Sequence, residues 1–167
     1  RRLNAPSGDT ENVGETLRRG YDVQLNLYPN DLARVWFSYS RQFSEILTPG
    51  PRLPASKGKE MDHVPHHLYA LGGDYQASEK LKLSAWVNGQ SDYYLERTNS
   101  TGQYGGYTLL NLGAEYRLSE SVSVDMQLKN ITNRYYEYVW YDPDGALDSL
   151  HAPGDGRALY AGLTLDF

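Results

Sequence analysis

The sequence predicts an all-β protein, an antiparallel up-and-down segment of a transmembrane β-barrel. Two features of the pattern support this fold class. Apolar and polar residues alternate with a period of two over several segments, as in strands whose two faces meet different surroundings. The connections between these segments alternate between short turns and long loops, which is typical of membrane-spanning barrels. The segments are long enough for this role, because about 9–11 tilted residues cross a bilayer as a strand.

The first predicted hairpin follows a polar stretch, residues 1–15, that we expect to be a loop. Its strands cover residues 21–28 and 33–40, and in both the apolar side chains fall on alternate positions. The Pro-Asn-Asp sequence at residues 29–31 joins them, and these residue types favour tight turns.

Two more hairpins follow the same pattern. The second has strands at residues 69–77 and 81–88, and the third has strands at residues 110–118 and 122–129. Short polar turns connect the two strands of each hairpin, whereas longer connections separate one hairpin from the next. These longer connections are expected at about residues 44–65, 96–103 and 132–155, and the first is rich in Pro and Gly.

The last predicted strand covers residues 158–166. Leu159, Leu163 and Leu165 share one face, and the residues between them are small or polar apart from Tyr160. The chain then stops at Phe167. In this respect it resembles bacterial outer-membrane barrels, whose assembly machinery reads a terminal Phe, so the resemblance implies that Phe167 is an assembly signal.

Length and composition exclude several classes of protein. The 167 residues suit one domain, and no run of 18 apolar residues predicts a transmembrane helix. The chain has no Cys, which excludes disulfides and thiolate metal sites, and its net charge of −5 argues against nucleic-acid binding. Its 15 Tyr suit interfacial girdles or ligand contacts. No apolar segment of a signal peptide follows Arg1, so for an exported protein we expect a mature chain or a fragment.

Seven strands of this kind leave two open edges, which hydrocarbon does not tolerate. Soluble barrels also run up and down, but they place apolar residues inside and need about eight strands to close. We therefore expect this chain to be a piece of a larger barrel, with its apolar side chains on the outer face and its polar side chains toward the lumen.

Several motifs resemble the end of a TonB-dependent outer-membrane receptor. The segment at residues 107–118 is followed by Asn-Ile-Thr-Asn-Arg-Tyr-Tyr at residues 130–136, by Pro-Gly-Asp-Gly-Arg at residues 153–157, and by Phe167. The order and spacing of these segments carry the resemblance, which covers nearly the whole chain. The family fold is a 22-stranded barrel with an N-terminal plug and a TonB box. The resemblance thus implies that residues 1–167 form about the last seven strands, with the plug and the first strands absent.

The same resemblance implies the function and the partners. It indicates an outer-membrane receptor for TonB-dependent uptake of a ferric siderophore or a similar scarce ligand, with cobalamin, heme and oligosaccharide as alternatives. TonB would act through the missing N-terminal region, and outer-membrane lipid and the barrel assembly machinery would be further partners. The localisation implied is the bacterial outer membrane, and no cofactor is expected. A passive porin-type segment is the alternative from another class, because porin lumens are also polar.

The candidate ligand-binding residues lie at the long-loop end. Trp140 and Tyr141 end an aromatic run inside the third long loop, where planar rings can stack on an aromatic chelator. An interfacial belt is the other interpretation of this run. Asn88 and Gln90 alternate at the end of a strand on the polar face, where they could touch a substrate.

Neither an enzyme nor a metal site is predicted. The chain has no Gly-x-Ser-x-Gly elbow that would indicate a serine hydrolase. His63, His66 and His67 could suggest metal ligands, but Pro65 restricts the backbone between them. A structural role in the loop is the preferred interpretation.

Overall fold

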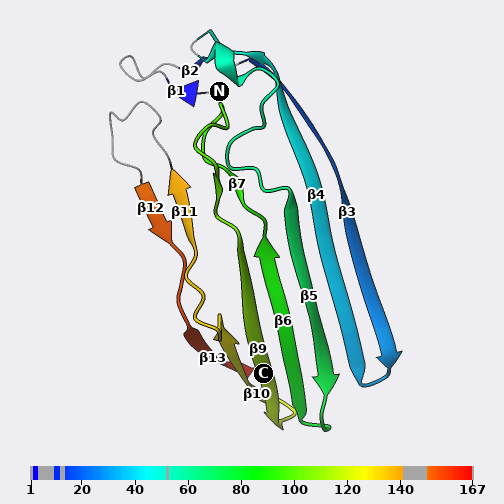
Figure 1. Cartoon of the computed structure of the whole chain (residues 1–167). Coiled ribbons are helices and arrows are strands. Elements are labelled where there is room, and N and C mark those ends of the chain that lie inside the picture. Colours follow the sequence, from blue (N-terminus) through cyan, green and yellow to red (C-terminus); the bar gives the residue numbers. More distant parts are fainter. Residues whose placement is uncertain (1, 4–9, 12–13, 52, 141–149, 167) are drawn as a thin grey trace.

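The computed structural model describes residues 2–3, 10–11, 14–51, 53–140 and 150–166. Its main feature is one curved sheet of seven antiparallel strands (Figure 1). The strands are β3 (Gly14–Asn30), β4 (Ala33–Pro49), β5 (His67–Gln76), β6 (Leu81–Gln90), β9 (Tyr107–Ser119), β10 (Val122–Lys129) and β13 (Ala158–Leu165). They lie in the order β13-β10-β9-β6-β5-β4-β3, so each strand pairs with its neighbour in chain order. β3 and β13 form the two edges of this sheet, which confirms the predicted open barrel segment.

Smaller elements lie at the end of the sheet that carries the long connections (Figure 1). They are β1 (Arg2–Leu3), β2 (Thr10–Glu11), the 3₁₀ turn η1 (Pro54–Ser56), β7 (Tyr93–Tyr94), β8 (Gln103–Tyr104), β11 (Glu137–Trp140) and β12 (Leu150–Pro153). β7 pairs with β8, and β11 pairs with β12, so two of the long connections contain hairpins of their own. Among the described residues, no helix is long and apolar enough to span a membrane.

All seven predicted strands are present, but the first two are much longer than predicted. β3 and β4 have 17 residues each, and their pairing runs from the Asn30–Ala33 turn to Gly14 opposite Pro49. The alternation that predicts this hairpin ends near Ser40. Backbone pairing does not need alternating side chains, and so the ladder continues into residues for which the sequence predicts loops.

The turns at the other end of the sheet are short because side chains supply their hydrogen bonds. Asn30 accepts a hydrogen bond from the backbone nitrogen of Leu32 at 2.9 Å. The Ser78 hydroxyl oxygen accepts from the backbone nitrogens of Lys80 at 3.3 Å and Leu81 at 3.1 Å. Both are turns in which a short polar side chain bonds to the backbone two or three residues further on.

The strand register divides the sheet into an apolar and a polar face. Val124 lies opposite both Leu163 and Tyr116, and Leu112 lies opposite Leu128, so these side chains share a face. Many of them are exposed: 42% of Leu112 and 62% of Leu163 is accessible. A sheet with so many exposed Leu side chains suits contact with hydrocarbon rather than water. The residues that occupy the polar face by the same register include Asn111, Glu115, Asp125, Lys129 and Thr164.

One row of the polar face depends on a glycine. Gly72 lies between Trp36 on β4 and Trp86 on β6. A Cβ atom at Gly72 would collide with the Trp36 ring and would lie 2.7 Å from the Trp86 Cβ. The absence of a side chain there leaves room for both tryptophans.

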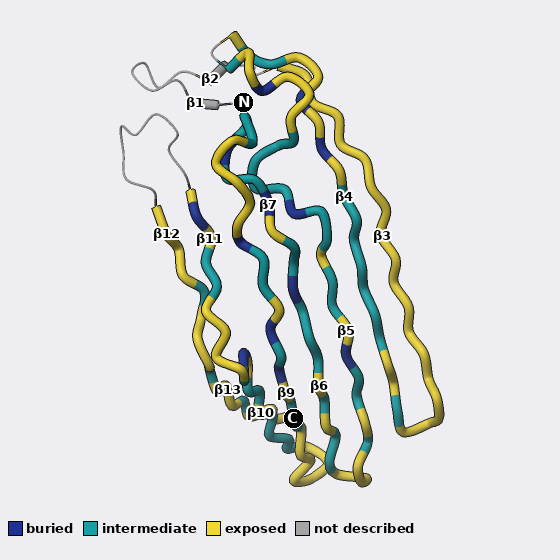
Figure 2. Tube along the Cα trace, viewed as in Figure 1, coloured by how far each residue is buried: buried dark blue, intermediate teal, exposed yellow. Residues whose placement is uncertain are grey.

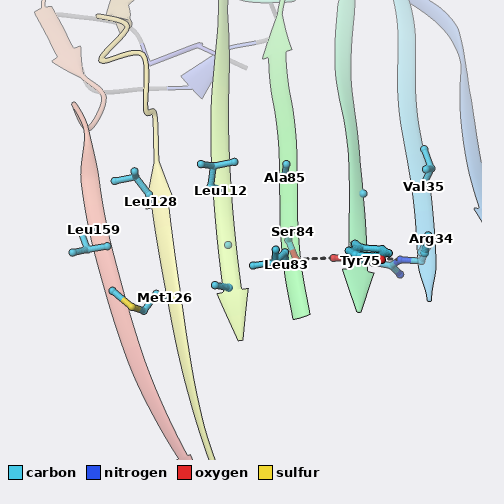
Figure 3. Close-up of a pocket in the computed structure, with 15 residues that line it drawn as sticks. Arg34, Val35, Tyr75, Leu83, Ser84, Ala85, Leu112, Met126, Leu128 and Leu159 are labelled. Carbon is cyan, nitrogen blue, oxygen red and sulfur yellow. Dashed lines mark hydrogen bonds and ion pairs between the residues drawn. The ribbon is translucent and has the colours of Figure 1, made fainter. Parts of the chain in front are cut away.

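The polar face also carries an ion pair near the short turns. Arg34 Nη2 lies 2.6 Å from Asp74 Oδ2, and Ser84 donates a hydrogen bond of 2.9 Å to the other carboxylate oxygen (Figure 3). Arg34, Asp74 and Ser84 are cross-strand neighbours on β4, β5 and β6.

A shallow hollow spans β4 to β13 and is lined almost entirely by apolar atoms (Figure 3). Large side chains such as Leu112 and Leu128 surround smaller ones such as Ala85 and Gly73. These residues belong to the apolar face by register. In a barrel segment this surface is suited to lipid hydrocarbon, so the hollow is not the predicted ligand site.

Buried residues concentrate toward the long-connection end, whereas β3 is exposed along its whole length (Figure 2). The buried side chains at this end include Tyr93, Leu109, Val139, Asn111 and Asn130. The compact part of the described chain therefore lies where the connections are long.

The assignment of the apolar face to lipid can be tested with two adjacent residues of β10. Met126→Arg places a charge among apolar neighbours, and we expect it to lower the free energy of unfolding by about 2–4 kcal/mol if Met126 is near the bilayer midplane. Gln127→Arg is the matched control, since Gln127 lies opposite Gly113 and Tyr160 on the other face. The measurement is urea unfolding of the intact protein in lipid vesicles. Equal losses in both variants would contradict the assignment.

Candidate functional site

The predicted residue Asn88 belongs to a chain of three asparagines on the polar face. The Asn111 amide nitrogen donates to the Asn88 side-chain oxygen at 3.0 Å, and the Asn111 oxygen accepts from the backbone nitrogen of Asn130 at 3.0 Å. Asn111 and Asn130 are buried, and Asn88 is half-buried. Buried amides need partners, and the Asn111 side chain finds them in the Asn88 side chain and the Asn130 backbone. Asn88 is therefore placed by the structure, with part of its surface open.

Asn130 begins the third long connection and fixes its path. Its side-chain oxygen accepts from the Arg134 backbone nitrogen at 2.8 Å, and its nitrogen donates to the carbonyls of Arg134 at 2.8 Å and Asp155 at 3.1 Å. Asn133 accepts from the Arg157 backbone nitrogen at 3.0 Å. Both asparagines have positive φ, 50° and 52°, a conformation that Asn tolerates better than most residues. The Asn-Ile-Thr-Asn sequence thus joins the two ends of this connection.

Gln90 has a structural partner as well. Its side-chain nitrogen donates to the Gly105 carbonyl at 2.9 Å, which ties the end of β6 to the end of the connection that contains β7 and β8. Asn88 and Gln90 lie on the same face by their spacing. Gln90 therefore holds the β7–β8 connection against the end of β6.

Trp140 is the last residue of β11, and 38% of its surface is exposed. It pairs with Leu150 on β12, and Tyr138 shares its face of this hairpin. Tyr141 and Phe167, the other two predicted residues, lie outside the described residues. The structure therefore places one predicted aromatic side chain on an exposed hairpin, separate from the asparagine chain.

His63 joins three connections, a role that the sequence did not reveal. Its backbone nitrogen donates to the Tyr94 carbonyl at 2.9 Å, and its Nε2 lies 2.8 Å from the Val139 carbonyl oxygen. Its ring packs against Tyr93 and Tyr138, with ring centroids 5.4 and 5.0 Å away. The imidazole thus contacts both short hairpins, β7–β8 and β11–β12.

The acidic residue Asp62 stabilises the junction, by which we mean the contacts of His63 with the β7–β8 and β11–β12 hairpins. Asp62 Oδ2 lies 3.3 Å from His63 Nδ1, and Asp62 Oδ1 accepts from Arg97 Nε at 3.0 Å. Burial raises the pKa of Asp62, but the hydrogen bonds from His63 and Arg97 outweigh burial and lower it to about 2. The hydrogen bond to Asp62 raises the pKa of His63, burial opposes this rise, and the Val139 carbonyl adds to it.

Asn99 makes a second contact between the connection after β4 and the connection after β6. Its side chain accepts from the Glu60 backbone nitrogen at 2.8 Å and donates to the Glu60 carbonyl at 3.1 Å. The turn around Asn99 is built on Glu96, whose carboxylate accepts from the backbone nitrogens of Thr98, Ser100 and Thr101. Burial raises the pKa of Glu96, but the hydrogen bond from the Thr98 hydroxyl, together with these backbone hydrogen bonds, lowers it to about 2.

The three neighbouring histidines have separate partners. His63 bonds as described, His66 Nε2 lies 2.6 Å from Glu60 Oε2, and His67 contacts Tyr39 and Arg41. In the part of the chain that the structure describes, no group of three or more His, Cys, Asp or Glu side chains is placed to hold a metal ion.

The raised pKa of His63 predicts that the junction weakens at alkaline pH. A group whose pKa is higher in the folded state stabilises that state below its unfolded value, about 6.5, and this contribution is lost as the pH rises through the folded value. We therefore expect hydrogen exchange of the backbone amides in residues 59–63 and 94–99, corrected for its intrinsic pH dependence, to accelerate as the pH rises above about 6.5.

His63→Gln should remove most of that pH dependence, whereas His67→Gln, in which the altered residue contacts Tyr39 and Arg41 instead, should keep it. The same pH dependence in the His63 variant would show that another group controls the junction.

Comparison with known proteins places these features in a family. Residues 2–131 match the family model for the TonB dependent receptor-like β-barrel. The metal-pseudopaline receptor CntO of Pseudomonas aeruginosa is 26% identical over 96% of this chain and 22% of its own length. The crystal structure of BauA, the ferric preacinetobactin receptor from Acinetobacter baumannii, is 25% identical and has a TM-score of 0.73. The structural match covers 92% of this chain and 22% of the BauA chain.

The siderophore receptor PiuA from Acinetobacter baumannii has the same fold, with a TM-score of 0.76, 20% identity, and coverage of 92% of this chain and 22% of its own. The chain thus spans about a fifth of the length of these relatives. They are receptors and not enzymes. Because the family model covers more than three quarters of the residues, this chain belongs to the TonB-dependent receptor β-barrel family of the bacterial outer membrane.

Proposed function

We propose that this chain is the C-terminal part of the barrel of an outer-membrane receptor that takes up a ferric siderophore or a related metal chelate. The family match over residues 2–131 carries the proposal. Relatives that are similar over nearly all of this chain are receptors for metal-pseudopaline and for ferric preacinetobactin. In the complete protein, a plug and the remaining strands would precede residues 1–167, and TonB would act on that N-terminal region.

The polar face and the long-connection end support a binding role. The asparagine chain offers hydrogen-bonding groups near the compact end of the sheet, and the β11–β12 hairpin carries the exposed Trp140. We propose Trp140, with Tyr141, as the aromatic contact for the ligand, and Asn88 as a polar contact. Gln90 would act mainly by holding the β7–β8 connection. Outer-membrane lipid would cover the apolar face, and the assembly machinery would read Phe167.

A passive porin is the alternative function, and an uptake assay separates the two. Cells that depend on the full-length protein should accumulate radiolabelled ferric chelate, and deletion of TonB should abolish accumulation. Accumulation that continues without TonB at the same rate would indicate a passive channel and would contradict the proposal.

The role of Trp140 can be tested in the intact receptor. Trp140→Ala should weaken binding of the transported chelate at least fivefold, because truncation of a central aromatic contact usually costs more than about 1 kcal/mol. Tyr116→Ala is a matched control, since Tyr116 is also exposed (45%) but lies on the apolar face near the short turns. Equilibrium binding by isothermal titration calorimetry provides the measurement. Unchanged affinity in the Trp140 variant would remove this residue from the site.

A further inference from the structure

Four side chains with oxygen or nitrogen donors converge at the base of the β11–β12 hairpin. The carboxylate of Glu137 is at their centre. Its Oε1 accepts from the Tyr104 hydroxyl at 2.8 Å, and its Oε2 accepts from the Tyr135 hydroxyl at 2.7 Å. His151 Nδ1 lies 3.1 Å from Oε2. Three separate segments supply this Glu137 cluster: β8, the start of β11 with the residue two before it, and β12.

The strand register brings the cluster together. Glu137 pairs with Pro153 and Val139 pairs with His151, so Glu137 and His151 are diagonal neighbours on one face of the hairpin. Tyr138 and Trp140 occupy the opposite face. The cluster is thus distinct from the aromatic surface proposed for the chelate.

Solvent can reach the donors around the carboxylate. Only 9% of the Glu137 side chain is exposed, whereas 53% of the His151 side chain and 65% of Tyr135 are exposed. Tyr104 is also exposed. The carboxylate is thus recessed, and the donors around it lie at the protein surface.

The donor set suits a hard, highly charged cation. Two phenol oxygens and a carboxylate are hard oxygen donors, and imidazole is also a good ligand for iron. Adjacent donors of an octahedral ion with metal–ligand distances of about 2.0–2.1 Å lie about 2.9 Å apart. The three donor contacts of Glu137 are close to that separation before any rearrangement.

The charges of the cluster favour a trivalent over a divalent ion. The hydroxyls of Tyr104 and Tyr135 both donate hydrogen bonds to Glu137, so both carry protons when no cation is bound. Loss of both protons gives two phenolates and one carboxylate, which balance a charge of +3. The charged groups that also act on Tyr104 are Asp92 and Arg134, which are opposite in sign.

We propose that Tyr104, Tyr135, Glu137 and His151 form a binding site for ferric iron on the protein itself. In the binding step two phenol O–H bonds break and two protons pass to solvent. Three Fe–O bonds and one Fe–N bond form in place of bonds from the iron to nitrilotriacetate or water, which leave it, with no change in oxidation state. This inference goes beyond the proposed function, because it requires neither a particular chelate nor energised transport.

Visible absorption tests the site directly, because phenolate bound to Fe³⁺ gives a charge-transfer band. The full-length receptor in detergent is titrated with ferric nitrilotriacetate at a fixed, near-neutral pH, because binding that releases protons depends on pH. We expect one equivalent of iron to produce the band. The apparent affinity should rise with pH, as the release of protons requires.

Three variants and one control identify the ligands. Tyr104→Phe, Tyr135→Phe and Glu137→Gln should each reduce the band at least tenfold at the same iron concentration. Tyr138→Phe should leave it unchanged, because Tyr138 is an exposed tyrosine on the other face of the same hairpin. Circular dichroism and heat-dependent gel mobility would establish that each variant is folded. The two tyrosine variants alter residues on different segments, so each tests the site separately.

Several outcomes would overturn the proposal. The absence of a band in the folded wild-type receptor would mean that the cluster is only a hydrogen-bond network. An equal band in folded Tyr104→Phe and Tyr135→Phe would place the iron elsewhere. Saturable binding of Zn²⁺ or Cu²⁺ without binding of Fe³⁺ would refute the choice of ion. Uptake of a ferric chelate is measured separately, so failure of this site would leave the proposed function untouched.

Discussion

The structure depends on the need to pair every backbone amide and carbonyl that lies in hydrocarbon. Lipid offers no hydrogen bonds, so a strand in the membrane must be paired on both sides. In the described sheet, β4, β5, β6, β9 and β10 meet this requirement, and only β3 and β13 have a free side. Once the backbone is paired, side chains need only suit the face on which they lie, which explains why rows of Leu are acceptable on one face and Arg34 with Asp74 on the other.

Beyond the sheet, the same requirement is met by side chains. Asn130, Asn99 and Glu96 each bond to several backbone groups, and they shape connections that have little regular structure. His63 and Asp62 then join one connection to the next. The long-connection end is therefore held by a small number of polar residues, each of which contacts several backbone groups or side chains. A ligand surface built on such connections gains its fixed shape from these contacts rather than from an apolar core.

The sequence predicted the strands well, because alternation reports directly on a face that meets lipid. It was less informative where side chains do not alternate: β3 already begins at Gly14, before the predicted start at Tyr21, and β4 continues past Ser40. The β7–β8 and β11–β12 hairpins are only two and four residues long in each strand. Trp140 could be proposed as a ligand contact because it lies near the end of an aromatic run. The cluster at Glu137 could not, since Tyr104 on β8 and Glu137 on β11 are about thirty residues apart and meet only in the folded chain.

The close packing around Gly72 gives the sheet an intrinsic fluorescence probe. Trp36 and Trp86 lie on either side of this glycine, and they are two of the chain's three tryptophans. Because both indoles lie on the polar face and approach one another only when β4, β5 and β6 are paired in the observed register, their emission reports on the centre of the sheet. The third tryptophan, Trp140, lies on a hairpin outside the sheet. Replacement of Trp140 by Phe would leave Trp36 and Trp86 as the only tryptophans within residues 1–167, so that the emission from this part of the protein would follow strand assembly, separate from events at the connections.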